Sequence, residues 1–347
     1  MHKKYKMATN VEYPKVKGLA KLETIVFFTM LLVFGFIVFI GAVVLWYIGA
    51  EGITGILIAI VFSAVIVLIQ WYLGPILIKR MTNMRELKEN EHPEIFAIVK
   101  RLSQIAGISM PKLYIVYNSE PNAFAFGRTQ SSSNIAVHTG LLNVLNEREV
   151  EGVLAHEIGH IKHKDVAVIT VASMLPIMLY YIIIVLGFSR SNREGGAPFI
   201  VMWIGAMIAQ FIGQLFVLYL SRKREYYADA FSAYITKNPV ALMSGLAKIT
   251  YGLGVHAQAG GVKSTDKALR CFYIADPGES DTKSIIQIAR AIDAKDAKEI
   301  EKAIENEKNM LGGEFLRTHP FTAKRLLSLW NIEKELHRGY RNVGAEY

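Results

Sequence analysis

Four long apolar runs, each nearly free of charged residues, dominate the pattern of hydrophobic and polar positions along the chain. A helix needs about 20 consecutive apolar residues to cross a bilayer, and each run reaches that length. The runs cover approximately residues 24–50, 53–78, 166–188 and 198–220. Only short turns join the first run to the second and the third to the fourth, so the pattern predicts two transmembrane hairpins. A second run so close behind the first disfavours a cleaved signal peptide.

Outside these runs, apolar residues recur at the spacings of ordinary helices and strands. Residues 92–108 have helical spacing and end near Gly107, which predicts a helix. Residues 146–165 predict a second helix, which Asn146 caps and Glu149 closes as a capping box. Between the two helices, apolar and polar positions alternate in residues 112–117, 122–127 and 134–140. Alternation is typical of strands, and it predicts a small antiparallel sheet.

The segment after the fourth apolar run is mostly helical in pattern. Residues 225–249 predict helical structure that is interrupted near Pro239. Residues 256–282 are rich in Gly, Ser and Asp, which indicates a loop or lid. Residues 284–308 predict a charged amphipathic helix or a pair of helices.

Composition supports a chain that is part membrane and part soluble. It is 52% hydrophobic, which is high for a soluble domain, and 20% charged, which is high for a pure membrane bundle. The single cysteine, Cys271, excludes an internal disulfide and a cysteine-cluster zinc site. The predicted fold class is therefore an α+β integral membrane protein, with four transmembrane helices and a mostly helical soluble domain.

The distribution of charge predicts the orientation of the hairpins. The formal net charge is +9, and Lys and Arg cluster beside the apolar runs: in the N-terminal tail, in residues 79–88 and in residues 221–225. Because such residues mark the cytoplasmic ends of spans, both termini and both long polar segments are expected in the cytoplasm. This placement explains the basic composition without nucleic-acid binding, which is not expected as a partner class.

A candidate metal site lies just before the third apolar run, in the sequence HEIGH. His156 and His160 are four residues apart, so both imidazoles lie on one face of a helix and can reach one zinc ion. Glu157 lies about 100° around the helix, where it can act as general base on a water held by the zinc. His163 is about 10 Å along the helix from His156, too far to bind the same ion.

A catalytic zinc site needs a third protein ligand and an open fourth position. Glu225, which follows the second hairpin, can complete a site of two histidines and one glutamate. Asp229, one turn further on, can orient a ligand histidine through its free ring nitrogen. Asp165 can support the site or anchor the helix, and it can equally be a charge that stops the membrane span at the interface.

Four motifs resemble those of the HtpX membrane zinc metalloproteases, relatives of the CaaX prenyl endoproteases and the OMA-type proteases. They are PNAFAFG, HEIGHIKHKD, SRKREYYADA and THPFTAKRL, and their order and spacing agree with the family over nearly the whole chain. The resemblance implies a gluzincin-type fold and one Zn²⁺ bound by His156, His160 and Glu225, with Glu157 as base. It also implies quality control of membrane proteins.

The resemblance further implies where substrate binds. The strand in NAFAFG corresponds to the edge strand along which family members lay an extended substrate, so Asn122, Ala123 and Phe124 are expected to contact it. The alternative for Asn122 is a turn residue that enters the strand. His319 is expected to stabilise the oxyanion of the tetrahedral intermediate, and its alternative is a structural role before Pro320 at a helix start.

Together, these patterns predict a zinc endopeptidase of the cell membrane with a cytoplasm-facing active site and misfolded or damaged membrane proteins as substrates. Two alternatives remain, a CaaX-type prenyl-protein endoprotease and a catalytically silent membrane scaffold with a structural metal. The predicted organisation has four parts. Residues 1–78 form the tail and first hairpin, and residues 79–165 form the first part of the catalytic domain. Residues 166–220 form the second hairpin, and residues 221–347 form the second catalytic part with the third ligand.

Overall fold

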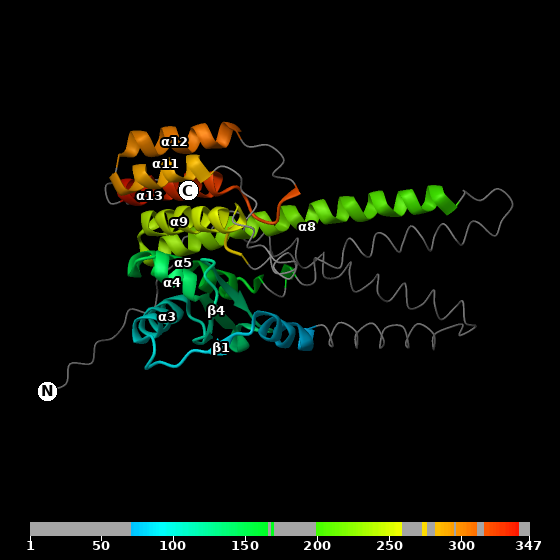
Figure 1. The fold of residues 1–347 in the computed structure, drawn as a ribbon, viewed down its shortest axis with the longest axis horizontal. Coiled ribbons are helices and arrows are strands. Elements are labelled where there is room, and N and C mark those ends of the chain that lie inside the picture. Colours follow the sequence, from blue (N-terminus) through cyan, green and yellow to red (C-terminus); the bar gives the residue numbers. More distant parts are fainter. Residues whose placement is uncertain are drawn as a thin grey trace.

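Figure 1 shows a computed structural model of the chain, which describes residues 71–165, 168–169, 199–258, 273–275, 282–294, 296–310 and 316–339. The first predicted span, most of the second and nearly all of the third lie outside these residues, as does most of the predicted loop at 256–282. In the described part, the helix Trp203–Thr236 is long and apolar enough to cross a membrane. It contains most of the fourth predicted span.

A small mixed sheet forms one side of the described part, with the strand order β1-β2-β4-β3. Its strands are β1 (Arg85–Glu86), β2 (Lys112–Val116), β3 (Ala123–Phe126) and β4 (Asn134–His138). β2 pairs in parallel with β4, whereas β1 with β2 and β3 with β4 are antiparallel. The three predicted strands are confirmed, but the prediction of an antiparallel sheet is wrong.

The loop between β2 and β3 explains the parallel pair. It carries the chain past the position of β4, so that β3 becomes the outer strand and β4 returns between β2 and β3. Two backbone bonds hold this loop over the end of β4: Gly140 N donates to Asn118 O at 2.8 Å, and His138 N donates to Asn122 O at 2.9 Å. A Cβ at position 140 would lie 2.1 Å from Ser119 O, so the close approach requires glycine.

Helices cover one side of the sheet in layers (Figure 1). Helix α5 lies next to the sheet and contacts β3 on one side and helices α8 and α9 on the other. Helices α11, α12 and α13 lie beyond α9, as the upper part of Figure 1 shows. The main helices are α3 (Pro93–Ala106), α4 (Thr139–Val144), α5 (Glu147–Lys162), α8 (Phe199–Thr236), α9 (Pro239–Gln258), α11 (Thr282–Ala294), α12 (Ala297–Met310) and α13 (Thr322–Gly339), with a short 3₁₀ turn at Gln130–Ser132.

Local signals place both ends of α5. Asn146 Oδ1 accepts from Glu149 N at 3.1 Å and Glu149 Oε2 accepts from Asn146 N at 2.9 Å, which confirms the predicted capping box. The helix ends at Lys162, three residues before the predicted end. It ends there because Lys164 takes a left-handed backbone conformation with φ 58°. The metal motif is thus separated by a turn from the apolar run that follows it.

Helix α8, in contrast, has no such break. Its 38 residues run from the fourth predicted span through Glu225 and Asp229 as one continuous helix, which projects far beyond the other labelled helices in Figure 1. Close packing on α5 brings these carboxylates to the histidines. A Cβ at Gly159, between His156 and His160, would lie 3.2 Å from Ala228 Cα of α8. The glycine therefore allows the two backbones to approach closely.

Candidate metal centre

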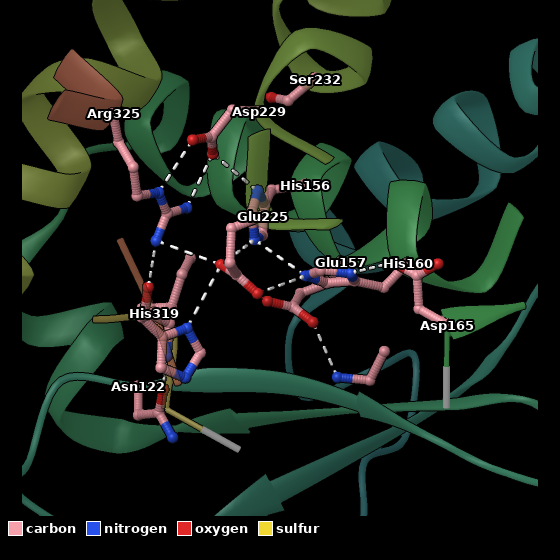
Figure 2. Close-up of polar contacts among 12 residues, drawn as sticks. Asn122, His156, Glu157, His160, Asp165, Glu225, Asp229, Ser232, His319 and Arg325 are labelled. Carbon is pink, nitrogen blue, oxygen red and sulfur yellow. Dashed lines mark hydrogen bonds and ion pairs between the residues drawn. The ribbon is translucent and has the colours of Figure 1, made fainter. Parts of the chain in front are cut away.

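The three predicted ligands meet in one cluster between α5 and α8 (Figure 2). The Nε2 atoms of His156 and His160 are 3.1 Å apart. His156 Nε2 lies 3.5 Å from Glu225 Oε2, and His160 Nε2 lies 3.5 Å from the other oxygen, Oε1. The three ligand atoms lie within 4.8 Å of one another, so the cluster can hold a metal ion.

The donor set and its spacing fit a tetrahedral zinc ion. Two ligand atoms at 2.0–2.1 Å from a tetrahedral centre lie about 3.3 Å from each other. The two Nε2 atoms, 3.1 Å apart, and each Nε2 with a different oxygen of Glu225, at 3.5 Å, are close to that separation. Two imidazole nitrogens and one carboxylate oxygen are ligands that catalytic zinc takes. Glu225 Oε2 also lies 3.2 Å from Arg325 Nη1, so a buried cation stabilises the charge of this carboxylate beside the metal position.

His156 is held by a buried chain of charges that reaches α13. Its Nδ1 lies 2.9 Å from Asp229 Oδ1, and Arg325 binds both oxygens of Asp229, with Nε to Oδ2 at 2.8 Å and Nη2 to Oδ1 at 2.7 Å (Figure 2). Burial lowers the pKa of His156, but the contacts with Asp229 and Glu225 outweigh burial and raise that pKa to about 9. The predicted role of Asp229 beside a ligand histidine agrees with this geometry.

His160 has a different carboxylate partner, contributed by the turn after its own helix. Its Nδ1 lies 2.5 Å from Asp165 Oδ2, and the guanidinium of Arg224 forms an ion pair with the other oxygen of Asp165. Burial and the neighbouring His156 hold the pKa of His160 well below its usual range. The structure thus places Asp165 next to the ring nitrogen of His160 that does not face Glu225.

Glu157 connects the cluster to the sheet. Its Oε2 accepts a hydrogen bond from the backbone N–H of Ala125 on β3 at 2.7 Å. Burial raises the pKa of Glu157 to about 7, although the charge of His156 opposes the rise. A carboxyl group with a pKa near 7 can exchange protons at neutral pH, as a general base must.

A cavity of about 440 Å³ opens beside the cluster. His156, Glu157, His160 and Glu225 line it, together with β3 and His319. His319 is buried, and its Nδ1 lies 3.4 Å from Glu225 Oε2. The structure therefore brings His319 to the cluster. His163 is not among the ligands of the cluster, and it packs edge-on against Phe231.

The predicted substrate-contacting residues lie on the opposite wall. Ala123 and Phe124, on the outer strand β3, line the cavity. Asn122 is buried, and its Oδ1 accepts a hydrogen bond from Ile274 N at 3.1 Å. The carbonyl oxygen of Ile274 accepts one from Arg325. Asn122 thus holds a segment of the chain itself, residues 273–275, against the cavity.

Residues 89–333 match the model of peptidase family M48. The chain belongs to peptidase family M48. "Protease HtpX homolog" from Methanothermobacter thermautotrophicus is 39% identical to this M48 peptidase over 67% of this chain and 87% of that protein. Proteins of the same name from Aeropyrum pernix and Campylobacter concisus are 34% and 30% identical over 85% and 84% of this chain and 93% and 92% of theirs. The predictions of an HtpX relative and of a membrane metalloendopeptidase are confirmed.

A solved structure is also similar to this M48 peptidase. The crystal structure of S. mikatae Ste24p matches with a TM-score of 0.47 and 17% sequence identity, and the match covers 90% of this chain and 66% of that chain. A likeness this distant supports no inference about the activity or the substrates of the chain.

Sequence reasoning missed two buried arginines of this M48 peptidase. Arg325 was seen only as part of the motif THPFTAKRL, yet it is 1% exposed and binds Asp229. Arg224 was counted among the basic residues that orient the membrane spans, yet it is 2% exposed and pairs with Asp165. The available signal was the position of Arg224 directly before Glu225 on a predicted helix. No comparable local signal connects Arg325 with Asp229, which lies 96 residues away.

Proposed function

We propose that this M48 peptidase is a zinc-dependent endopeptidase that cuts extended segments of misfolded or damaged membrane proteins. The observation that carries the proposal is the buried meeting of His156, His160 and Glu225 with Glu157 at a cavity bounded by an outer strand. A purely structural zinc site would instead close its fourth position with another protein ligand.

The residues around the cluster have different chemical roles in this proposal. A bound zinc ion supplies a Lewis acid, which polarises a carbonyl group and acidifies water. Glu157 takes a proton from the attacking water and passes it to the leaving amine, a task that suits its pKa of about 7. His319, whose Nδ1 is 3.4 Å from Glu225 Oε2, is placed to donate to the oxyanion that forms at the cleaved carbonyl group.

Substrate backbone pairs with the outer edge of β3 in this proposal. In an antiparallel pair, neighbouring residues point their backbone groups alternately toward and away from the partner strand. Asn122 O accepts from His138 N of β4, so the backbone groups of Ala123 and Ala125 point outward, where Glu157 Oε2 already accepts from Ala125 N. The backbone of Ala123 is therefore assigned to pairing with substrate, which would give affinity with little sequence preference. Phe124, whose backbone faces β4, is assigned to contact substrate from the cavity wall that it lines. Asn122 acts on substrate indirectly, because its side chain holds Ile274 in the cavity wall.

The proposal also places the active site on the cytoplasmic side of the cell membrane, in a protein with four spans. The basic residues beside the apolar runs support this orientation. Reporter enzymes fused after residue 339 and within residues 189–197 should report opposite sides of the membrane. If both reporters are active on the same side, the second hairpin does not exist.

The peptidase activity is tested with the protein purified in detergent, loaded with zinc and given an unfolded protein as substrate. The Glu157→Gln variant should bind as much zinc as the parent and should cut at less than about one hundredth of its rate, because it lacks the base. Equal cutting by both forms, or no cutting with any metal, would contradict the proposal. Cutting restricted to prenylated C-terminal peptides would favour the CaaX-type alternative, and zinc binding without any cutting would favour the scaffold.

A further inference from the structure

A line of polar side chains leads from the metal cluster along the apolar part of α8. Gln210, Gln214, Ser221 and Glu225 are separated by four, seven and four residues, so they share one face of the helix. Other positions of this part of the helix expose large apolar side chains: Ile200, Val201, Trp203, Ile204, Met207, Ile208, Phe211, Ile212, Phe216 and Tyr219. Polar side chains in a membrane span are costly unless they meet polar groups, so their position calls for a function.

The cavity at the metal cluster reaches one of these glutamines. From Glu225 it follows α8 past Ser221 and Leu218 to Gln214, which is exposed and lines the cavity. Gln210, one turn further on, is exposed but is not among the lining residues. Gln214 therefore lines the cavity and Gln210 does not, although both are glutamines on the same helix.

The far wall of the cavity belongs to the helical residues 71–82 and is fastened to the sheet. Trp71, Gly74 and Pro75 line the cavity there. Trp71 Nε1 donates to Arg128 O at 3.2 Å, and Arg128 Nη2 donates to Tyr72 O at 2.6 Å. Since Arg128 follows β3, these bonds tie the wall to the strand on which substrate is proposed to lie.

The length of this path can be compared with that of a peptide. Gln214 lies 11 residues before Glu225, which corresponds to about 17 Å along the helix axis. An extended peptide covers about 3.3 Å per residue. A substrate with its cleaved bond at the metal cluster would therefore bring a residue about five positions away to Gln214.

The chemistry of this end of the cavity selects the kind of segment that fits. Apart from Gln214, its wall is largely apolar and includes Pro75, Ile78, Val217 and Leu218. Apolar substrate side chains suit such a wall, but the peptide groups between them need hydrogen-bond partners in apolar surroundings. A carboxamide offers both a donor and an acceptor, which matches the N–H and C=O of one peptide group.

We propose that Gln214 is a substrate-binding residue whose carboxamide binds the backbone of an extended apolar segment, about five residues from the cleaved bond. The inference rests on the proposed peptidase function and adds a substrate class to it. The preferred segments are apolar stretches that leave the bilayer along α8 and enter the cavity between α8 and residues 71–82.

Kinetics on an apolar peptide that extends six residues on each side of the cleaved bond test the proposal. Gln214→Leu removes the carboxamide at similar volume, and Gln210→Leu is the matched control on the same helix. The loss of one hydrogen bond should raise KM about fivefold to tenfold for Gln214→Leu, with kcat and zinc content unchanged. Gln210→Leu should behave as the parent does. A peptide that extends only two residues on each side should not distinguish the variants. Equal KM for Gln214→Leu and the parent on the long peptide, or an equal loss in Gln210→Leu, would overturn the proposal.

Cross-linking separates this inference from the peptidase activity. The only cysteine is replaced by Cys271→Ser, and Gln214→Cys or Gln210→Cys is introduced together with Glu157→Gln, so that bound peptide is not cut. Two long peptides carry a thiol-reactive group five residues from the expected cleavage point, one on each side of it. One of them should link to position 214 at least fivefold faster than to position 210. Linkage at 214 together with a parent that cuts nothing supports the subsite and contradicts the peptidase proposal, whereas equal linkage at both positions overturns the subsite.

Discussion

His156 and His160 lie one helical turn apart on α5, but the protein supports them in different ways. His156 is completely buried, and its carboxylate partner Asp229 belongs to the unbroken helix α8. The side chain of His160 is 16% exposed, and its partner Asp165 comes from the turn that ends its own helix. The break after α5 and the continuity of α8 therefore both support the site, because each provides one histidine with an orienting carboxylate.

The two supports also differ in how firmly they are fixed. Asp229 is held by a bidentate contact with Arg325, a geometry that is strong and specific. Asp165 has an ion pair with Arg224 and lies next to a left-handed residue. We therefore expect substitutions on the His156 side to have larger effects than the matched substitutions on the His160 side.

The largest effect is expected from Arg325→Met, which would leave Asp229 and Glu225 as neighbouring buried carboxylates without their cation. Removal of one partner from a buried charge pair costs about 3–5 kcal/mol. The metal-free variant should unfold at a clearly lower temperature than the parent, as measured by circular dichroism in detergent. Arg325→Lys, which keeps the charge but loses the planar fork, should lose less. Identical unfolding of the Met variant and the parent would show that the chain of charges does not stabilise the site.

A smaller and unequal effect is expected when each orienting carboxylate is replaced by its amide. Substitution of the group that orients a metal-binding histidine typically lowers metal affinity about 10-fold to 100-fold. Asp229→Asn should lie at the upper end of this range, because Asp229 is buried and also binds Arg325. Asp165→Asn should lie at the lower end, because water can reach the exposed side of His160. A competition assay with a zinc chelator measures both affinities, and a larger loss for Asp165→Asn would reverse the comparison.

Metal binding should release a proton from one histidine and not from the other. In the metal-free protein at pH 8, His156 is mostly protonated because Asp229 and Glu225 outweigh burial and raise its pKa to about 9. The pKa of His160 is well below its usual range, so this residue is already neutral. Zinc must displace the proton of His156, so at least about one proton should be released per ion, and affinity should weaken as the pH falls below 9. Calorimetry in buffers of different ionisation enthalpy counts that proton, and no release at pH 8 would contradict the assignment.

The smallest effect concerns the turn that supports His160. Lys164 has φ 58°, a conformation that glycine adopts without cost. Lys164→Gly should therefore leave zinc affinity unchanged and alter the free energy of unfolding by less than about 1 kcal/mol. Lys164→Val should destabilise the turn by about 1–2 kcal/mol and weaken zinc binding, since Asp165 would shift. If the two variants bind zinc equally, the turn conformation does not position Asp165.

Local periodicity explains why much of the fold was predictable. Helix α3, the strands β2 to β4 and the cap of α5 each depend on neighbouring residues, and each lies within a few residues of its predicted place. The pairing of β2 with β4 depends on the path of the loop at residues 117–122, which alternation does not encode. Likewise, the sequence predicts both a span before Glu225 and a helix around it, but nothing in their composition indicates that they form one continuous helix.

In the candidate site too, residues fixed by local spacing were predictable and those fixed by distant contacts were not. His156, Glu157 and His160 were predictable because their spacing on one helix fixes their relative positions. Glu225 required the additional rule that a catalytic zinc has a third ligand. Arg325 was not predictable, because buried arginines are rare and its partner Asp229 lies 96 residues away in the sequence. The bond from Asn122 to Ile274, across 152 residues, escaped prediction for the same reason.

Because α8 is unbroken, a tilt of its apolar part also moves the part that carries Glu225. Glu225 lies about 22 Å along the axis from residue 210, near the middle of the predicted span. A tilt of about 5° around that point would move the backbone at Glu225 by about 2 Å, as much as the length of a bond between zinc and its ligand. Because helices tilt to match the thickness of the bilayer, a span placed as proposed would couple the third ligand mechanically to the membrane. Zinc affinity compared across nanodiscs of short-chain and long-chain lipids would measure that coupling.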